Sequence, residues 1–206
     1  MNDVWYYASR FLLMAAGSLA VIFPLRLLCA LARRKRGRCR STALHEIGVC
    51  LFLAMLAALA CATVVPAMEW DGQRLQLLMD GGGRNTELGR VFRDTYYISY
   101  LWGNHSYFWL NIVGNLLLFV PIGLLTPLLW PRWRRWGLPV LLGLLLSLGI
   151  EFSQLFIGRG ADVDDVWLNT LGALLGYGLF LLLRRLFPRF CAAWTVKKEN
   201  PPGGRV

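Results

Sequence analysis

Long apolar runs separated by short polar connections dominate this chain, and their lengths are typical of helices that cross a membrane. A helix needs roughly 20 apolar residues to span the hydrocarbon core, and it satisfies its own backbone groups there. The pattern therefore predicts an all-α fold, a polytopic transmembrane bundle of about five spans. The predicted spans are residues 11–32, 43–68, 108–130, 137–157 and 166–187.

Basic residues gather in alternate connections, which sets the expected orientation of the bundle, whereas the turn at residues 158–165 is acidic. Because arginine-rich loops stay in the cytoplasm, we expect the N-terminus outside and the C-terminus inside. Arg26 and Glu46 lie near the basic side of the first two spans, where snorkelling or mutual pairing explains them. The basic residues in the connections are Arg33, Arg34, Lys35, Arg36, Arg38, Arg40, Arg132, Arg134, Arg135, Arg184, Arg185 and Arg189.

The same pattern divides the chain into four parts. Residues 1–68 contain two transmembrane helices joined by a basic cytoplasmic loop, and residues 69–107 form an extracytoplasmic loop. Residues 108–187 form a three-helix core, and residues 188–206 form a cytoplasmic tail.

The extracytoplasmic loop is expected to carry short surface helices at residues 74–79 and 91–101. The aromatic residues around the start of the third span favour interface anchors over a binding role, because such rings settle at the level of the lipid head groups. His105, just above the third span, is a further candidate for contact with an outer pocket. The aromatic residues are Tyr96, Tyr97, Tyr100, Trp102, Tyr107, Phe108 and Trp109.

Composition agrees with a membrane protein and argues against several other classes. Hydrophobic residues make up 56% of the 206 residues, more than is usual for a soluble domain. The net charge of +10 comes largely from loops beside the spans, so we expect no nucleic-acid partner. The five cysteines form no CxxC pair or Cys/His cluster, so we expect no metal, disulfide framework or cofactor. The sequence has no Ser-His-Asp, Cys-His or HExxH arrangement, and enzyme status stays open.

Polar residues within the last three spans recur on single helix faces near one level of the membrane. Glu151 and Gln154 share a face of the fourth span, and Asp165 and Asn169 share a face of the fifth. At about 1.5 Å of rise per residue, these polar groups lie within roughly 10 Å of the outer end. A carboxylate such as Glu151 is costly in lipid and marks a functional site by default.

We therefore predict an acid–amide pocket that opens to the outer surface, with one arginine at its mouth. Glu151 is the candidate catalytic residue, as a general acid or base. The turn between the fourth and fifth spans supplies the arginine and three aspartates, among them Asp164. The candidate ligand-binding residues are Asn111, Asn115, Gln154, Arg159, Asp162, Asp165 and Asn169.

Helix packing is the simpler interpretation of these polar and small residues. Asparagine and glutamine form hydrogen bonds between helices, and Gly172 with Gly176 makes a GxxxG packing step. For the glycines we favour packing, and for Asn111 and Asn115 both interpretations stand. Glu151 differs, because packing alone does not require an ionisable group.

The spacing of these residues resembles the VanZ-like family of bacterial membrane proteins over residues 104–183. The resemblance lies in Asn111-x3-Asn115-x3-Phe119-x-Pro121-x-Gly123 and in Glu151-x2-Gln154-x4-Arg159-x2-Asp162-x2-Asp165-x3-Asn169-x2-Gly172-x3-Gly176. It implies a multi-pass protein of the bacterial cytoplasmic membrane, with its recurrent polar positions at the candidate residues above. The founding member of the family is linked to low-level teicoplanin resistance, but the resemblance supplies no mechanism.

Three functions are compatible with the pattern. In the first, the pocket binds or modifies an envelope lipid, a lipid-linked precursor or a glycopeptide, with Arg159 on a phosphate and the amides on the head group. Asp162 and Asp165 then position Arg159 or hold a divalent cation. In the second, the polar residues form a structural network in a non-enzymatic accessory protein with partners in an envelope pathway. Transport ranks third, because the inner halves of the spans are almost entirely apolar.

Overall fold

The computed structural model describes residues 2–35, 42–63, 67–70, 75–78, 84–101, 103, 105–135, 137–156 and 160–196 of the chain. Within these residues five helices are long and apolar enough to cross a membrane, so the chain is a multi-pass membrane protein with an all-α bundle, as predicted. The two ends of this bundle are named the predicted outer end and the predicted inner end, after the arginine distribution. The spans are Tyr7–Ala32, Ala43–Thr63, Ser106–Leu129, Leu138–Phe156 and Val163–Leu186.

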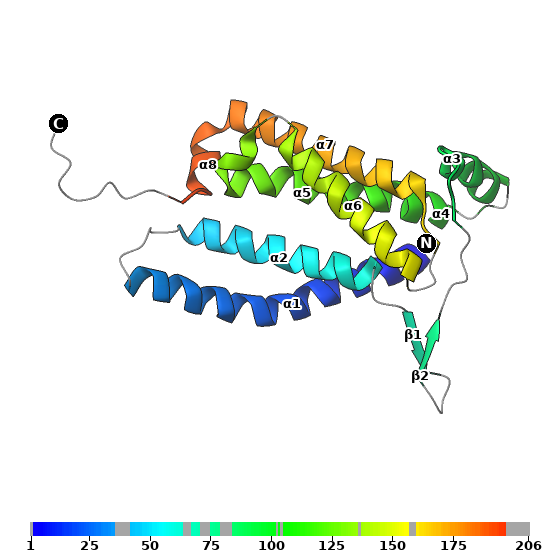
Figure 1. The fold of residues 1–206 in the computed structure, drawn as a ribbon, viewed down its shortest axis with the longest axis horizontal. Helices are drawn as coiled ribbons and strands as arrows, with labels where there is room; N and C mark the ends of the chain where they lie inside the picture. The colour runs from blue at the N-terminus through cyan, green and yellow to red at the C-terminus, as the bar shows by residue number, and fades with distance from the viewer. Residues whose placement is uncertain are drawn as a thin grey trace.

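The spans form two layers (Figure 1). Helices α1 (Asn2–Lys35) and α2 (Ala43–Thr63) lie side by side, and α1 packs mainly on α2. The second layer contains α5 (Asn115–Leu129), α6 (Leu138–Phe156) and α7 (Val163–Leu186). A buried cluster joins α2 to this second layer, and its members are Leu59, Phe119, Ile122 and Ala173.

Helices α5 and α7 approach each other backbone to backbone. A Cβ added at Gly172 would collide with the carbonyl group of Leu116, and one added at Gly176 would collide with that of Val120. Only a residue without a side chain permits such an approach. The GxxxG step on α7 therefore packs against α5, which confirms the packing interpretation of these two glycines.

Helix α7 begins at Val163 rather than at residue 166, because Asp162 caps it. The Asp162 side chain accepts a hydrogen bond from the Asp164 N–H at 2.8 Å. This bond satisfies one of the free N–H groups of the first turn, and carboxylates are favourable beside the positive end of a helix. The acidic turn predicted from the sequence is thus partly the first turn of α7.

Helix α2 ends at Thr63 rather than at residue 68, and a short β-hairpin follows it. Strand β1 (Ala67–Trp70) pairs in an antiparallel manner with β2 (Leu75–Leu78). The prediction of a helix at residues 74–79 is therefore wrong. So short an apolar run is compatible with a helix or a strand, and its pairing with β1 makes it a strand.

Helical segments follow in the later part of this connection. Helix α3 (Arg90–Thr95) leads into the π-helical segment η1 (Tyr96–Leu101), which confirms the helix predicted at residues 91–101. Helix α4 (Ser106–Phe108) and the π-helical segment η2 (Trp109–Gly114) lead directly into α5. The two helical segments contact each other at the predicted outer end, where α3 and α4 are neighbours (Figure 1).

The predicted inner end is closed by α8 (Pro188–Ala193), which packs against the start of α2. The Thr42 hydroxyl donates a hydrogen bond to the Ala193 carbonyl at 2.8 Å. Nearby, Arg26 Nη2 lies 2.6 Å from Glu46 Oε2. The mutual pairing predicted for these two charges is therefore confirmed.

Candidate functional site

Glu151 lies in the outer part of α6 and is only 7% exposed. Its Oε2 accepts a hydrogen bond from the Asp162 N–H at 2.7 Å. Because Asp162 is the N-cap of α7, this bond holds the beginning of α7 against α6. The carboxylate of Glu151 is therefore buried, as the sequence predicts. The hydrogen bond above comes from a backbone N–H group.

Asn85, in the segment that precedes α3, binds the same end of α7. Its Nδ2 donates a hydrogen bond to Asp162 Oδ1 at 2.7 Å. Its backbone N–H donates to the Ala161 carbonyl at 2.9 Å, and its carbonyl accepts from the Val163 N–H at 3.1 Å. Sequence reasoning missed Asn85, because its partners lie almost 80 residues later and no local pattern points to them.

Asp164 is fully buried and holds α3 in place. Its carboxylate accepts hydrogen bonds from the Gly89 N–H at 2.6 Å, the Val91 N–H at 2.8 Å and Trp167 Nε1 at 2.9 Å. Gly89 has a φ of 86°, a left-handed conformation that favours glycine. The free N–H groups at the start of α3 thus find an acceptor on another helix, as helix N-termini require.

Asn111, Asn115 and Asp165 lie where α5 meets α7. Asn115 Nδ2 donates hydrogen bonds to Asp165 Oδ1 and, at 3.1 Å, to the Asn111 carbonyl. Asn111 Nδ2 donates to the Tyr107 carbonyl of its own helix at 3.0 Å. The structure therefore brings Asn115 and Asp165 together, whereas the side-chain amide of Asn111 donates its hydrogen bond to a backbone carbonyl one turn earlier.

The other predicted residues are more dispersed. Asn169 donates to the Ser147 hydroxyl at 2.9 Å, and its buried Oδ1 has no hydrogen-bond partner among the described residues. Gln154 Nε2 lies 3.3 Å from the Thr63 carbonyl, at the end of α2. Arg159 lies outside the residues that the structure describes.

These contacts define an acid–amide network at the predicted outer end. The charges of Glu151, Asp162 and Asp164 all act on Asp165, so the four carboxylates form one electrostatic group. In the described ranges no three acidic, histidine or cysteine side chains are arranged to hold a metal ion. The members of the network are Asn85, Asn115, Glu151, Asp162, Asp164 and Asp165.

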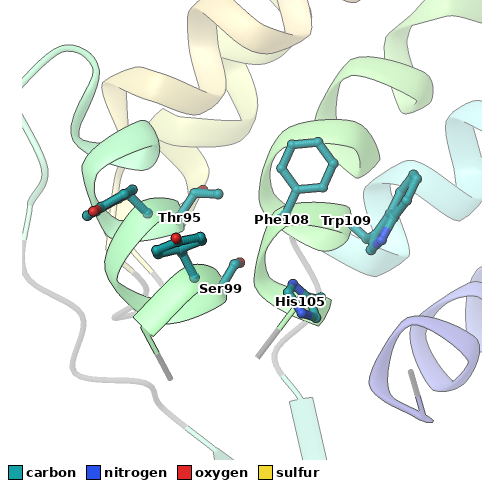
Figure 2. A pocket seen from close by; sticks show the side chains of 7 residues that line it. Thr95, Ser99, His105, Phe108 and Trp109 are labelled. Atoms are coloured by element: carbon teal, nitrogen blue, oxygen red, sulfur yellow. The ribbon is translucent and has the colours of Figure 1, made fainter. Parts of the chain in front are cut away.

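A pocket of about 300 Å³ opens at the predicted outer end, between η1 and the α4–η2 segment (Figure 2). Thr95 and Ser99 face it from one helix, and His105 and Phe108 face it from the other. The Thr95 hydroxyl is buried and has no hydrogen-bond partner in the part of the chain that the structure describes. The lining residues are Thr95, Tyr96, Ser99, Tyr100, His105, Phe108 and Trp109.

The network supports both walls of this outer pocket. Asp164 holds the start of α3, and α3 continues into η1, the first wall. Asn115 binds Asp165 and begins α5, which continues from η2 in the second wall. The sequence predicts a role at the outer end for His105 and for the aromatic residues. Aromatic residues at this level are also typical of interface anchors, so the sequence alone does not predict the pocket.

Comparison with known proteins identifies one family. A family model described as VanZ/LLP1 matches residues 52–184. The match begins within α2, well before the motif residues on which the resemblance rests, and so includes the outer connection with Asn85 and the pocket. Neither a curated protein nor a solved structure matches the chain.

Proposed function

Because this chain belongs to the VanZ/LLP1 family, we propose that it is a bacterial cytoplasmic-membrane protein that binds an envelope lipid or a lipid-linked envelope precursor at its predicted outer end. The observation that carries this proposal is the outer pocket of about 300 Å³, whose walls continue from helices that the acid–amide network holds. That volume is at the lower limit for small-molecule sites, so it suits a head group or a single ring rather than a whole lipid.

The lining of the pocket suits a ligand at the membrane surface. The Tyr96 and Tyr100 rings stack with centroids 5.4 Å apart, and aromatic rings offer an apolar face beside a polar edge. Ser99, His105 and the unpaired hydroxyl of Thr95 add hydrogen-bonding groups. A buried hydroxyl without a partner is unusual, and the head group of a ligand would satisfy it once a local movement exposes it.

Under this proposal the acid–amide network positions the pocket and does not react. Glu151 and Asp164 accept hydrogen bonds from backbone N–H groups, which fixes α7 and α3. A lipid-linked precursor whose head group is held in the pocket would account for a contribution to teicoplanin-type resistance.

Photolabelling tests this proposal. The full chain in phosphatidylcholine vesicles is irradiated with a photoactivatable polyprenyl phosphate, and separately with a photoactivatable diacyl phospholipid. We expect labelled peptides within residues 90–114. Tyr100→Ala should lower the labelling about fivefold, since an aromatic contact is worth about 1 kcal/mol. Tyr97→Ala is the matched control, because Tyr97 is exposed and does not line the pocket.

Equal loss of labelling in both tyrosine variants, or labelling spread over all the helices, would refute the pocket as the binding site. A fluorescent teicoplanin derivative distinguishes the ligands, because it should compete with the polyprenyl probe only if the glycopeptide binds here.

A non-enzymatic accessory role is the second candidate. It is favoured by the backbone donors of the network, which make its carboxylates structural supports. In that case substitutions in the network lower the amount of folded protein, and neither probe labels the pocket. Specific labelling of residues 90–114 would contradict this alternative.

A further inference from the structure

Arg134, at the opposite end of the bundle, is fixed over the surface of α7. It ends the 3-10 segment η3 (Pro131–Arg134) between α5 and α6. Its Nε donates a hydrogen bond to the Pro127 carbonyl at 3.0 Å, and its guanidinium carbon lies 5.7 Å from the centroid of the Phe180 ring. The Tyr177 hydroxyl donates to the Arg134 carbonyl at 3.3 Å. The charge is therefore pre-positioned and does not move freely in solvent.

Arg184 lies on the same face of α7 as these contacts. Tyr177, Phe180 and Arg184 are separated by three and four residues, which places them in one row along the helix. Arg184 is thus one turn beyond the ring that Arg134 covers. Burial lowers the pKa of Arg134, and the neighbouring positive charge of Arg184 lowers it further.

Within the residues that the structure describes, neither arginine forms an ion pair with a carboxylate. The groups that act on the Arg134 charge within the described residues are Arg184 and Cys191, and neither is a carboxylate. Arg134 Nη2 is buried and has no acceptor in the same part of the chain. Two neighbouring guanidinium charges are an arrangement that an anion bound beside both of them would stabilise.

The surroundings indicate an anion that is attached to a lipid. Phe187 and Phe190, just beyond Arg184, are 57% and 47% exposed, so apolar surface adjoins the two arginines. Arginine-rich inner ends of spans lie at the anionic surface of the cytoplasmic leaflet. Guanidinium groups suit the oxygens of a phosphate, and exposed aromatic rings suit the acyl chains beside it.

We propose that Arg134 and Arg184 together form a binding site for the phosphate of an anionic phospholipid in the inner leaflet. This site is separate from the outer pocket and does not depend on the ligand of that pocket.

Native mass spectrometry of the full chain in a neutral detergent tests the site. The probes are a synthetic phosphatidylglycerol, a phosphatidylcholine of the same chains, and inorganic phosphate. We expect one phosphatidylglycerol to remain bound preferentially. Arg184→Gln should weaken its binding about tenfold, the equivalent of one charge-assisted contact of about 1.4 kcal/mol. Arg134→Gln should do the same, and Arg184→Gln remains informative if Arg134→Gln does not fold.

Arg132→Gln is the matched control, because Arg132 is an exposed arginine of the same turn. It should change the binding by less than about twofold, since exposed pairs contribute little. An equal loss in Arg132→Gln and Arg184→Gln would refute a defined site and indicate diffuse attraction only. Equal retention of phosphatidylcholine would refute the requirement for an anionic head group. Inorganic phosphate that displaces the lipid completely at millimolar concentration would assign the site to a free anion instead.

Discussion

The Asp164 carboxylate of α7 accepts a hydrogen bond from the backbone N–H of Gly89 at 2.6 Å, across 75 residues of sequence. The Val91 N–H binds the same carboxylate, so a single buried side chain orients α3 relative to the membrane-spanning core. The outer pocket depends on this contact, because α3 continues into one of its walls.

Asp164→Ala should destabilise the outer connection more than any other single change in the network. It leaves the Gly89 and Val91 N–H groups and the Trp167 indole without their acceptor, at a cost on the order of 3 kcal/mol. Limited proteolysis should then cleave within residues 84–101 at a higher rate. Asp94→Asn is the control: Asp94 pairs with Arg90 near the surface, and its loss should cost less than about 1 kcal/mol. Equal protease sensitivity in the two variants would disprove the role of Asp164.

Glu151→Gln and Glu151→Ala separate a positioning role from a chemical one. The glutamine carbonyl can still accept the Asp162 N–H, so Glu151→Gln should keep most of the thermal stability and most of the photolabelling. Glu151→Ala removes the acceptor and should lower stability by about 1–3 kcal/mol. If the unsubstituted protein raises teicoplanin tolerance, a Glu151→Gln protein that is folded and labelled normally yet no longer raises it would instead favour acid–base chemistry.

Thr95→Val should stabilise the ligand-free protein while it weakens binding. The Thr95 hydroxyl is buried without a partner, so its replacement by a methyl group relieves a cost of about 1 kcal/mol. Photolabelling of the pocket should fall if a ligand uses that hydroxyl. Thr170→Val is the control, because the Thr170 hydroxyl already donates to the Val166 carbonyl at 2.7 Å. Unchanged labelling together with higher stability would leave Thr95 outside the binding contacts.

Gly176→Ala and Gly178→Ala test the contact between α5 and α7. A Cβ at Gly176 would strike the Val120 carbonyl, so Gly176→Ala should cost at least about 2 kcal/mol. Gly178 has nothing within 4 Å of an added Cβ, and Gly178→Ala should be neutral or stabilising by up to about 1 kcal/mol. Thermal unfolding in detergent compares the two, and equal transition temperatures would contradict the close packing.

The periodicity of apolar, polar and small residues along the sequence predicts the features that lie within a single helix. The spans and the packing face of Gly172 and Gly176 follow from residue spacing alone, and the structure confirms them. The common depth of the polar residues predicts a shared acid–amide pocket but not its pairs, and the hydrogen bond between Asn115 and Asp165 is a finding of the structure.

Contacts between distant segments were beyond the reach of the sequence. Asn85 and Gly89 carry no local signal for α7, so the support of α3 by Asp164 was not predicted. The sequence predicts a helix at residues 74–79, where the structure has the strand Leu75–Leu78, because the conformation of so short an apolar run depends on its partner strand. The outer pocket combines residues of two helices whose aromatic composition is equally typical of interface anchors.

The order of synthesis gives the Asp164 contact a further meaning. The ribosome synthesises α3 well before α7. The first N–H groups of α3 therefore have no Asp164 carboxylate to bind until α7 has been made. Insertion of the early helices into the bilayer and completion of the outer wall are therefore separate events in time. A nascent chain that stops before residue 160 would already be anchored, yet it would lack Asp162, Asp164 and Asp165, three of the four carboxylates of the network.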